Sequence, residues 1–163
     1  MGYLFQHSAL INWLDVFENV ALPLRETTSM REPEIRARVM QVLAQVGMED
    51  ARSKLPQQLS GGMQKRVGLA RALVTDPRVI LYDEPEAGLD PEMSASVSRL
   101  IRRLRDQLGT TSIVVTHSIH CARAVADQVA LFDSGRIVEV GPPEQVFESE
   151  HPRIREFFGR TTV

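Results

Sequence analysis

The strongest constraint on the fold is a run of four apolar residues, Val79–Tyr82, followed directly by Asp83, Glu84 and Pro85. A continuous apolar run of this length is typical of a strand buried on both faces of a parallel sheet. A second strand, rich in β-branched residues, is expected at 112–116, and apolar residues at helical spacing predict a helix between the two strands. Strands that alternate with helices predict an α/β fold with a largely parallel sheet.

The same kind of signal divides the rest of the chain into elements. We expect a strand at 2–6, an irregular stretch at 7–28, a helix from the capping-box spacing at 29–32 to Gly47, helices at 60–74, 91–108 and 118–126, strands at 129–132 and 137–140, and short terminal helices. Because 7–74 is mostly helical, this part is expected to form a separate helical lobe.

Composition narrows the classes of protein that need to be considered. The 163 residues carry a formal net charge of -2, which does not indicate a basic face for nucleic acid. Cys121 is the single cysteine, so no disulfide framework can form and a reducing, cytoplasmic compartment is expected. No apolar run approaches the roughly 20 residues that span a bilayer. Any role at a membrane would therefore depend on a partner.

The string Leu59-Ser60-Gly61-Gly62-Met63-Gln64 predicts a helix N-terminus capped by serine. Unpaired backbone N–H groups and the helix dipole make such an end attractive to an anion. The two glycines would let a phosphate approach the backbone closely. An ordinary capped helix is the alternative for Ser-Gly-Gly alone, whereas the complete string favours a phosphate site.

Polar side chains follow the predicted strands. Ligands of open α/β sheets bind beyond the carboxyl ends of strands, where Asp83 is suited to hold Mg²⁺, usually through water. Glu84 is suited to position and polarise an attacking water. His117 follows the next strand and should open on the same side of the sheet, and Gln6 ends the first strand. The alternatives are a solvated acidic turn and a structural histidine.

A final candidate is the turn at 87–91, which leads through Asp90 into a helix with proline in its first turn. The alternative for this turn is a plain helix start.

Taken in this order, the elements resemble the ATP-binding-cassette (ABC) ATPase domain. The matches are Gln6 with the Q-loop, Leu59–Gln64 with the LSGGQ signature (here with an extra methionine), Val79–Pro85 with Walker B and the catalytic glutamate, Ala87–Asp90 with the D-loop, and His117 with the switch histidine. The resemblance covers essentially the whole chain. It implies a P-loop NTPase-like (RecA-like) core, with a core strand at 1–6, a helical signature subdomain at 7–75, and the Walker B and H-loop core with the C-terminal part at 76–163.

The resemblance also implies ligands and partners. ATP and Mg²⁺ would be bound between two ABC ATPase domains, identical or different, paired head to tail. The residues implied are Glu84, His117 and Gln6 for catalysis, Asp83 and Gln6 for Mg²⁺, and Ser60, Gly61, Gly62, Gln64 and Asp90 for ATP held by the other domain. Transmembrane permease subunits are the second implied partner and would place the chain on the inner face of the cytoplasmic membrane. The candidates for that contact are Ile11, Trp13, Leu14 and Phe17, with core packing as the alternative.

One motif of the family is absent from this sequence. The P-loop G-x-x-x-x-G-K-[ST] grips the phosphates of ATP, but neither Lys54 nor Lys65, the two lysines present, follows a glycine. The resemblance therefore implies a domain without the P-loop strand and the N-terminal β-subdomain. We expect weak ATP affinity, no detectable hydrolysis by the chain alone, and an aggregation liability where the missing strand would pair. A truncated gene, a miscalled start or a trimmed chain would each produce this.

A finer resemblance concerns the cargo. Segments 5–10 and 16–26 are similar to the ATPase of Mla-type phospholipid transporters, a group tied to organic-solvent resistance, and imply a lipid cargo. Importers of other solutes share parts of the pattern. ABC ATPases of chromosome maintenance and DNA repair also carry the signature helix, but a long coiled coil usually splits their domain, and 6–60 is short and lacks heptads. The last alternative is a non-functional gene fragment.

Overall fold

The computed structural model describes residues 1–159. The elements are β1 (Gly2–Leu4), α1 (Val16–Thr27), α2 (Glu32–Val46), the 3-10 turns η1 (Glu49–Ala51) and η2 (Pro56–Gln58), α3 (Gly61–Leu73), β2 (Val79–Asp83), α4 (Pro91–Leu108), β3 (Thr111–Val115), α5 (Ile119–Val125), β4 (Val129–Asp133), β5 (Arg136–Gly141), α6 (Pro143–Phe147) and α7 (Pro152–Gly159).

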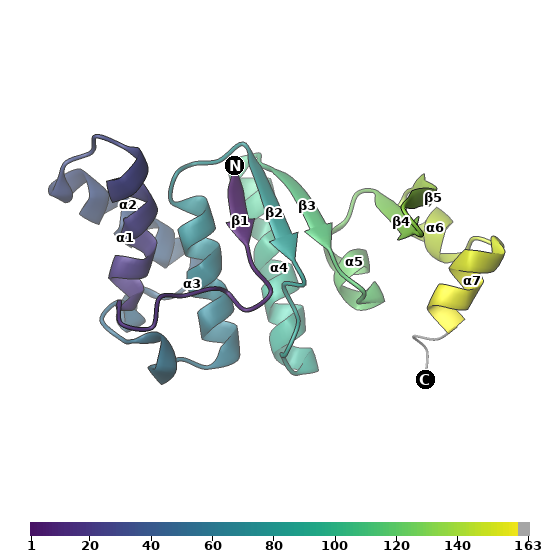
Figure 1. The fold of residues 1–163 in the computed structure, drawn as a ribbon, viewed down its shortest axis with the longest axis horizontal. Helices are drawn as coiled ribbons and strands as arrows, with labels where there is room; N and C mark the ends of the chain where they lie inside the picture. The colour runs from purple at the N-terminus through teal and green to yellow at the C-terminus, as the bar shows by residue number, and fades with distance from the viewer. Residues whose placement is uncertain (160–163) are drawn as a thin grey trace.

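Three strands form a parallel sheet in the order β1-β2-β3, and their arrowheads point the same way in Figure 1. The register pairs Gly2 with Ile80, and Ile80 in turn with Ser112. The connection from β2 to β3 runs through α4, which is the crossover helix that a parallel pair requires. The predicted α/β fold with a parallel sheet is confirmed.

Only one face of this sheet is covered within the described residues. Ile80 and Tyr82 are buried, whereas Ile113 is 52% exposed. Tyr3, Leu81 and Ile113 are paired across the three strands and form a row on the open face. The prediction of a β2 strand buried on both faces is therefore wrong for this chain, because no helix among residues 1–159 covers the face that carries Leu81.

The C-terminal strands do not extend the parallel sheet. β4 and β5 form a separate antiparallel hairpin, which lies with α6 and α7 beyond β3 in Figure 1. The hairpin turns at Ser134-Gly135, both with positive φ. A turn this short joins antiparallel neighbours, so Asp133–Arg136 sets the pairing direction.

Helix α3 lies between α1 and α2 on one side and the sheet on the other (Figure 1). A single cluster of buried apolar side chains joins these helices to the sheet and α4, with Leu4, Val20, Leu69, Ile80 and Leu100 among its members. Cys121 belongs to the same cluster, and burial raises the pKa of its thiol to about 12. Cys121 is therefore a small buried residue of the core.

The irregular stretch expected at 7–28 contains a helix, α1. Asp15 caps its N-terminus by accepting a hydrogen bond from the Glu18 amide at 2.8 Å. Its buried residues recur at helical spacing: Val16, Asn19, Val20, Ala21 and Leu24. The prediction is wrong because burial of this apolar face outweighs the cost of Pro23 inside the helix.

Helix α2 begins at a different residue from the one predicted. The capping box uses Arg31 and Glu34, with the Glu34 carboxylate accepting from the Arg31 amide at 2.7 Å, so Ser29 does not cap the helix. The end of the helix is as predicted, because Gly47 takes the left-handed conformation with φ 69°. Among residues 1–159, none of the helices combines the length and the apolar character needed to cross a membrane.

Candidate functional site at the carboxyl ends of the strands

The carboxyl ends of the three parallel strands meet at one edge of the sheet. This edge carries Gln6 two residues after β1, Asp83 and Glu84 at the end of β2, and His117 two residues after β3. Glu84 and His117 open on the same side of the sheet, as expected, because their side chains are in contact. A cleft of about 370 Å³ between β3 and β4 has Glu84 and His117 in its wall.

Glu84 and His117 form the central contact of this edge. Nδ1 of His117 lies 2.8 Å from Oε1 of Glu84. The side chain of Glu84 is 19% exposed and that of His117 74% exposed, so the pair sits at the protein–solvent boundary. The hydrogen bond to Glu84, followed by the charge of the same carboxylate, raises the pKa of His117 above its ordinary value of 6.5.

The backbone at Glu84 is strained. Its φ is 43°, in the left-handed region that non-glycine residues rarely adopt. Its amide donates to the Val115 carbonyl at 2.9 Å, so this residue still pairs with β3 while its side chain turns towards His117. Strain of this kind persists where the surroundings over-determine it, and it is concentrated at functional sites.

Asp83 and Gln6 are the oxygen-bearing side chains predicted to hold Mg²⁺. Oδ2 of Asp83 has one weak protein donor, the Tyr3 hydroxyl at 3.5 Å, and the exposed Gln6 side chain makes no hydrogen bond within residues 1–159. No group of three or more His, Cys, Asp or Glu side chains in this part of the chain is arranged as a metal site. Mg²⁺ typically takes only one or two carboxylates and completes its shell with water and phosphate, so these donors fit a phosphate-bound ion.

The tip of α3 presents unpaired backbone donors. Ser60 caps the helix, its hydroxyl oxygen accepting from the Met63 amide at 3.3 Å, as predicted. Within the described residues, the amide N–H groups of Gly61 and Gly62 have no acceptor. Ser60 and Gly61 are exposed. These features are those of an anion site at a helix N-terminus.

The other residues predicted to contact ATP, Gly62, Gln64 and Asp90, differ from one another in exposure and in bonding partners. Gly62 is buried, and a Cβ at this position would lie 2.0 Å from Met93 Cε, so its missing side chain serves contact with α4. Nε2 of Gln64 donates to the Pro56 carbonyl at 3.0 Å, so this side chain is bonded to the backbone that precedes the tip. Asp90 is exposed and caps α4 by accepting from the Met93 amide at 2.9 Å.

Two residues at this edge were not among the site residues predicted from the sequence. Lys65 is 4% exposed, and its Nζ donates to the carbonyls of Gln6 and Glu84. Glu86 is 8% exposed, and one of its carboxylate oxygens accepts from the Thr116 hydroxyl. For Lys65, its position on α3 could have indicated this role. The same helix carries Gly62 and Gly68, and residues without side chains indicate close packing against neighbouring elements.

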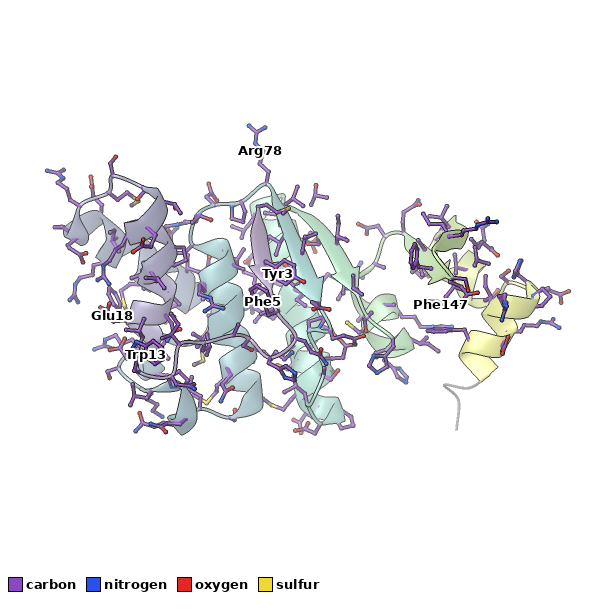
Figure 2. The ribbon with its side chains drawn as sticks, viewed as in Figure 1. Tyr3, Phe5, Trp13, Glu18, Arg78 and Phe147 are labelled. Carbon is purple, nitrogen blue, oxygen red and sulfur yellow. The ribbon has the colours of Figure 1, made fainter. Side chains whose placement is uncertain are left out.

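The segment predicted to contact a partner is organised by Asn19, which is fully buried. Its side chain accepts from the Ile11 amide at 2.8 Å and donates to the Ile11 and Leu14 carbonyls at 3.1 and 2.9 Å. Trp13, which lies between those two residues in the sequence, is 81% exposed, and Figure 2 labels it near the N-terminal end of α1. Ile11, Leu14 and Phe17 are only partly exposed, and the Phe17 ring faces the Arg36 guanidinium at 5.4 Å.

Comparison with known proteins identifies the family to which this chain belongs. The family model described as "ABC transporter" matches residues 1–87, which include the edge residues Gln6, Asp83 and Glu84 and the tip of α3. The chain belongs to the ABC transporter family. Solved ABC cassettes share its fold: the dimeric structure of MJ0796, a bacterial ABC transporter cassette, superposes with a TM-score of 0.76 at 34% identity, over 88% of this chain and 62% of that one. A post-hydrolysis state of MJ0796 bound to ADP and Pi gives a TM-score of 0.75.

Curated ABC relatives carry names for different cargoes. The probable ribonucleotide transport ATP-binding protein mkl of Mycobacterium tuberculosis is 46% identical over 156 residues, which are 96% of this chain and 44% of that protein. The methionine import ATP-binding protein MetN of Xanthomonas campestris pv. campestris is 44% identical over 158 residues, 96% of this chain and 47% of MetN. The chain thus spans less than half the length of these ABC relatives.

Proposed function

We propose that this chain is the ATP-binding subunit of an ABC transporter, which couples ATP hydrolysis at an interface between two cassettes to movement of a transmembrane partner. The observation that carries the proposal is the contact of Glu84 with His117 at the carboxyl ends of parallel strands, in a chain whose family is established. Ligands of open α/β sheets bind at this edge.

The edge residues have the chemistry that phosphoryl transfer to water requires. Glu84 would orient and polarise the attacking water, and His117 would hold the Glu84 carboxylate and sense the γ-phosphate. Asp83 and Gln6 would hold Mg²⁺, which supplies charge neutralisation to the phosphates when bound. The short reach from Glu84 to His117 supports a shared task for these two side chains.

The tip of α3 would act on nucleotide held by the second cassette. The free amides of Gly61 and Gly62 and the exposed Ser60 hydroxyl would contact its γ-phosphate, and Asp90 would lie at the same interface. We infer that Gln64 contributes indirectly, since its amide group holds the backbone that leads into the tip.

The loop around Trp13 is the proposed contact with the permease. An exposed indole on a loop fixed by a buried asparagine gives a rigid apolar anchor of the kind that dominates protein interfaces. We infer that Trp13 contributes most, and that Ile11, Leu14 and Phe17 mainly support the loop. Binding there would keep the subunit at the cytoplasmic face of the membrane.

The 163-residue chain by itself is expected to be inactive, because its sequence contains no P-loop and Asp83 and Glu84 supply carboxylates without a phosphate cradle. The test is phosphate release by the purified chain with and without Mg²⁺. Mg²⁺-dependent turnover that disappears in Glu84→Gln would refute this expectation.

For the cargo we propose a phospholipid, on the resemblance of segments 5–10 and 16–26 alone. Import of another solute is the second candidate, favoured by the relatives named for ribonucleotide transport and methionine import. Deletion of the gene separates the two: sensitivity to organic solvents with normal methionine and nucleoside uptake supports lipid transport, and the reverse pattern supports the importer.

A role on DNA is the candidate from another class. The net charge of -2 disfavours it, and the arginines Arg102, Arg103 and Arg105 of α4 donate to protein carbonyls or carboxylates. Binding to duplex DNA that weakens steeply with added salt would support the DNA role instead.

A further inference from the structure

Two cationic side chains of helix α3 donate hydrogen bonds to backbone carbonyls at the carboxyl edge of the sheet. Nζ of Lys65 lies 2.5 Å from the Gln6 carbonyl oxygen and 3.0 Å from that of Glu84. The Arg71 guanidinium donates to the carbonyls of Ser8 and Ala9, both at 2.7 Å. One helix therefore holds the loop after β1 and the residue after β2 at the same time.

These contacts coincide with backbone strain. Ser8, Ala9 and Glu84 have φ values of 58°, 46° and 43°, and the carbonyl of each accepts a hydrogen bond from Lys65 or Arg71. The other two non-glycine residues with positive φ among residues 1–159, Asp76 and Ser134, lie in turns, and their carbonyls accept no side-chain cation. Strained backbone persists only where its surroundings fix it, and here α3 supplies that constraint.

The cost of burying Lys65 indicates more than packing. Burial lowers the pKa of its ammonium group, while the carboxylates of Glu86, Glu84 and Asp83 act in the opposite direction. A methionine would fill a similar space without the cost of taking a charge out of water. The ammonium adds hydrogen bonds to two carbonyls, one in the loop after β1 and one at the residue after β2.

We propose that Lys65 and Arg71 are positioning residues that fix the Gln6–Ala9 loop and Glu84 relative to the tip of α3. The inference rests on the proposed function, in which Ser60–Gly62 contact one nucleotide and Glu84 acts on the other. Lys65 lies one helical turn from Gly61, so a displacement of the tip is passed to the backbone of Gln6 and Glu84 through two hydrogen bonds.

The first experiment measures amide hydrogen exchange in the 163-residue chain for Lys65→Met, Lys65→Arg and Arg71→Met. The reporting amides are Ser8 and Ala9, which close the loop after β1, and Ala87, which donates to the Glu84 carbonyl at 3.0 Å. In Lys65→Met we expect the Ser8 and Ala87 amides to exchange about tenfold faster, because hydrogen bonds from a charged donor are lost. Arg71→Met should accelerate Ser8 and Ala9, and Lys65→Arg should retain slow exchange.

The matched control is Lys54→Met, a change at the other lysine, which is exposed. It should leave all of these rates unchanged. The positioning role of Lys65 is overturned if the loop amides of Lys65→Met exchange at the rates of the unaltered chain. It is equally overturned if exchange rises as much in α1 and α2 as at the edge, since that would show general destabilisation.

The second experiment measures ATP turnover by a complete ABC ATPase subunit that contains this chain together with a P-loop, in complex with its permease. Lys65→Met should lower kcat about ten- to a hundredfold through misplacement of Glu84 and leave KM for MgATP within about twofold, because Lys65 bonds only protein carbonyls. An unchanged kcat would overturn the positioning role. If the unaltered complex does not hydrolyse ATP, the proposed function fails. The hydrogen-exchange experiment still decides whether Lys65 and Arg71 fix the Gln6–Ala9 loop and Glu84.

Discussion

At the scale of single residues, Glu84 has a left-handed backbone and a side chain directed at an exposed histidine. Neither feature favours stability, because the strain costs free energy and a contact this exposed is screened by water. A conformation that costs stability in this way is consistent with a catalytic role for Glu84.

Glu84→Gln should lower the pKa of His117 towards its ordinary value of about 6.5, because the hydrogen bond and the charge that raise it are lost. The folded-state pKa lies above the unfolded one, so the contribution of the pair to stability is present below pH of about 6.5 and is lost as pH rises through the folded pKa. It is small, since His117 is 74% exposed. An NMR titration of the His117 ring checks this, and an unchanged pKa in Glu84→Gln would contradict the pairing.

Asn19→Ala should lower the free energy of unfolding by about 2–4 kcal/mol, because it leaves the partly buried Ile11 amide and Leu14 carbonyl without their partner. Asn12→Ala is the matched control, since Asn12 is exposed in the same loop, and should change stability by less than about 0.5 kcal/mol. Urea denaturation of both variants gives the comparison. Equal effects would show that the Trp13 loop does not depend on Asn19.

At the scale of elements, α3 connects the helical part to the sheet, and its close approach depends on Gly68. A Cβ there would lie 2.9 Å from Leu4 Cδ1 and 3.2 Å from Ser8 Cβ. Gly68→Ala should therefore lower the free energy of unfolding by about 1 kcal/mol, since overpacking outweighs the gain in helix propensity. Combining it with Leu4→Val, which removes the nearest methyl group, should give a favourable coupling energy. Gly68→Ala that stabilises the chain would contradict this packing.

Much of this arrangement could be predicted from the sequence because local and tertiary preferences agree. The strand at Val79–Asp83 and the helix from Pro91 have strong patterns and clear boundaries. Helix α1 was not predicted, because the burial that outweighs the cost of Pro23 depends on packing against α3. The role of Lys65 could not be predicted, since its hydrogen bonds to backbone carbonyls in distant loops leave no sequence motif. The roles of the predicted site residues remain predictions, because contact with nucleotide is untested.

At the scale of the whole molecule, the described chain exposes apolar side chains where its sheet ends. Ile113 and Val115 of β3 are 52% and 61% exposed, and Phe132 of β4 is 70% exposed. Within residues 1–159, β3 pairs on one side only. A sheet edge with apolar neighbours is a site of association.

Ile113→Thr combined with Val115→Thr should therefore reduce aggregation of the 163-residue chain, with a change in the free energy of unfolding of less than about 0.5 kcal/mol per site. Threonine keeps the β-branched shape that suits a strand. Light scattering against concentration is the measurement. Unchanged scattering would show that this face does not drive association.

We propose that the carboxyl edge of the sheet hydrolyses ATP in a complete subunit that contains this chain together with a P-loop and is assembled with its permease. The most direct test is the turnover of that complex carrying Glu84→Gln, beside Glu26→Gln at an exposed position of α1. We predict a fall of about a hundredfold or more for Glu84→Gln, the usual contribution of a general base, and unchanged turnover for Glu26→Gln. Turnover by Glu84→Gln equal to that of the unaltered complex would contradict the account.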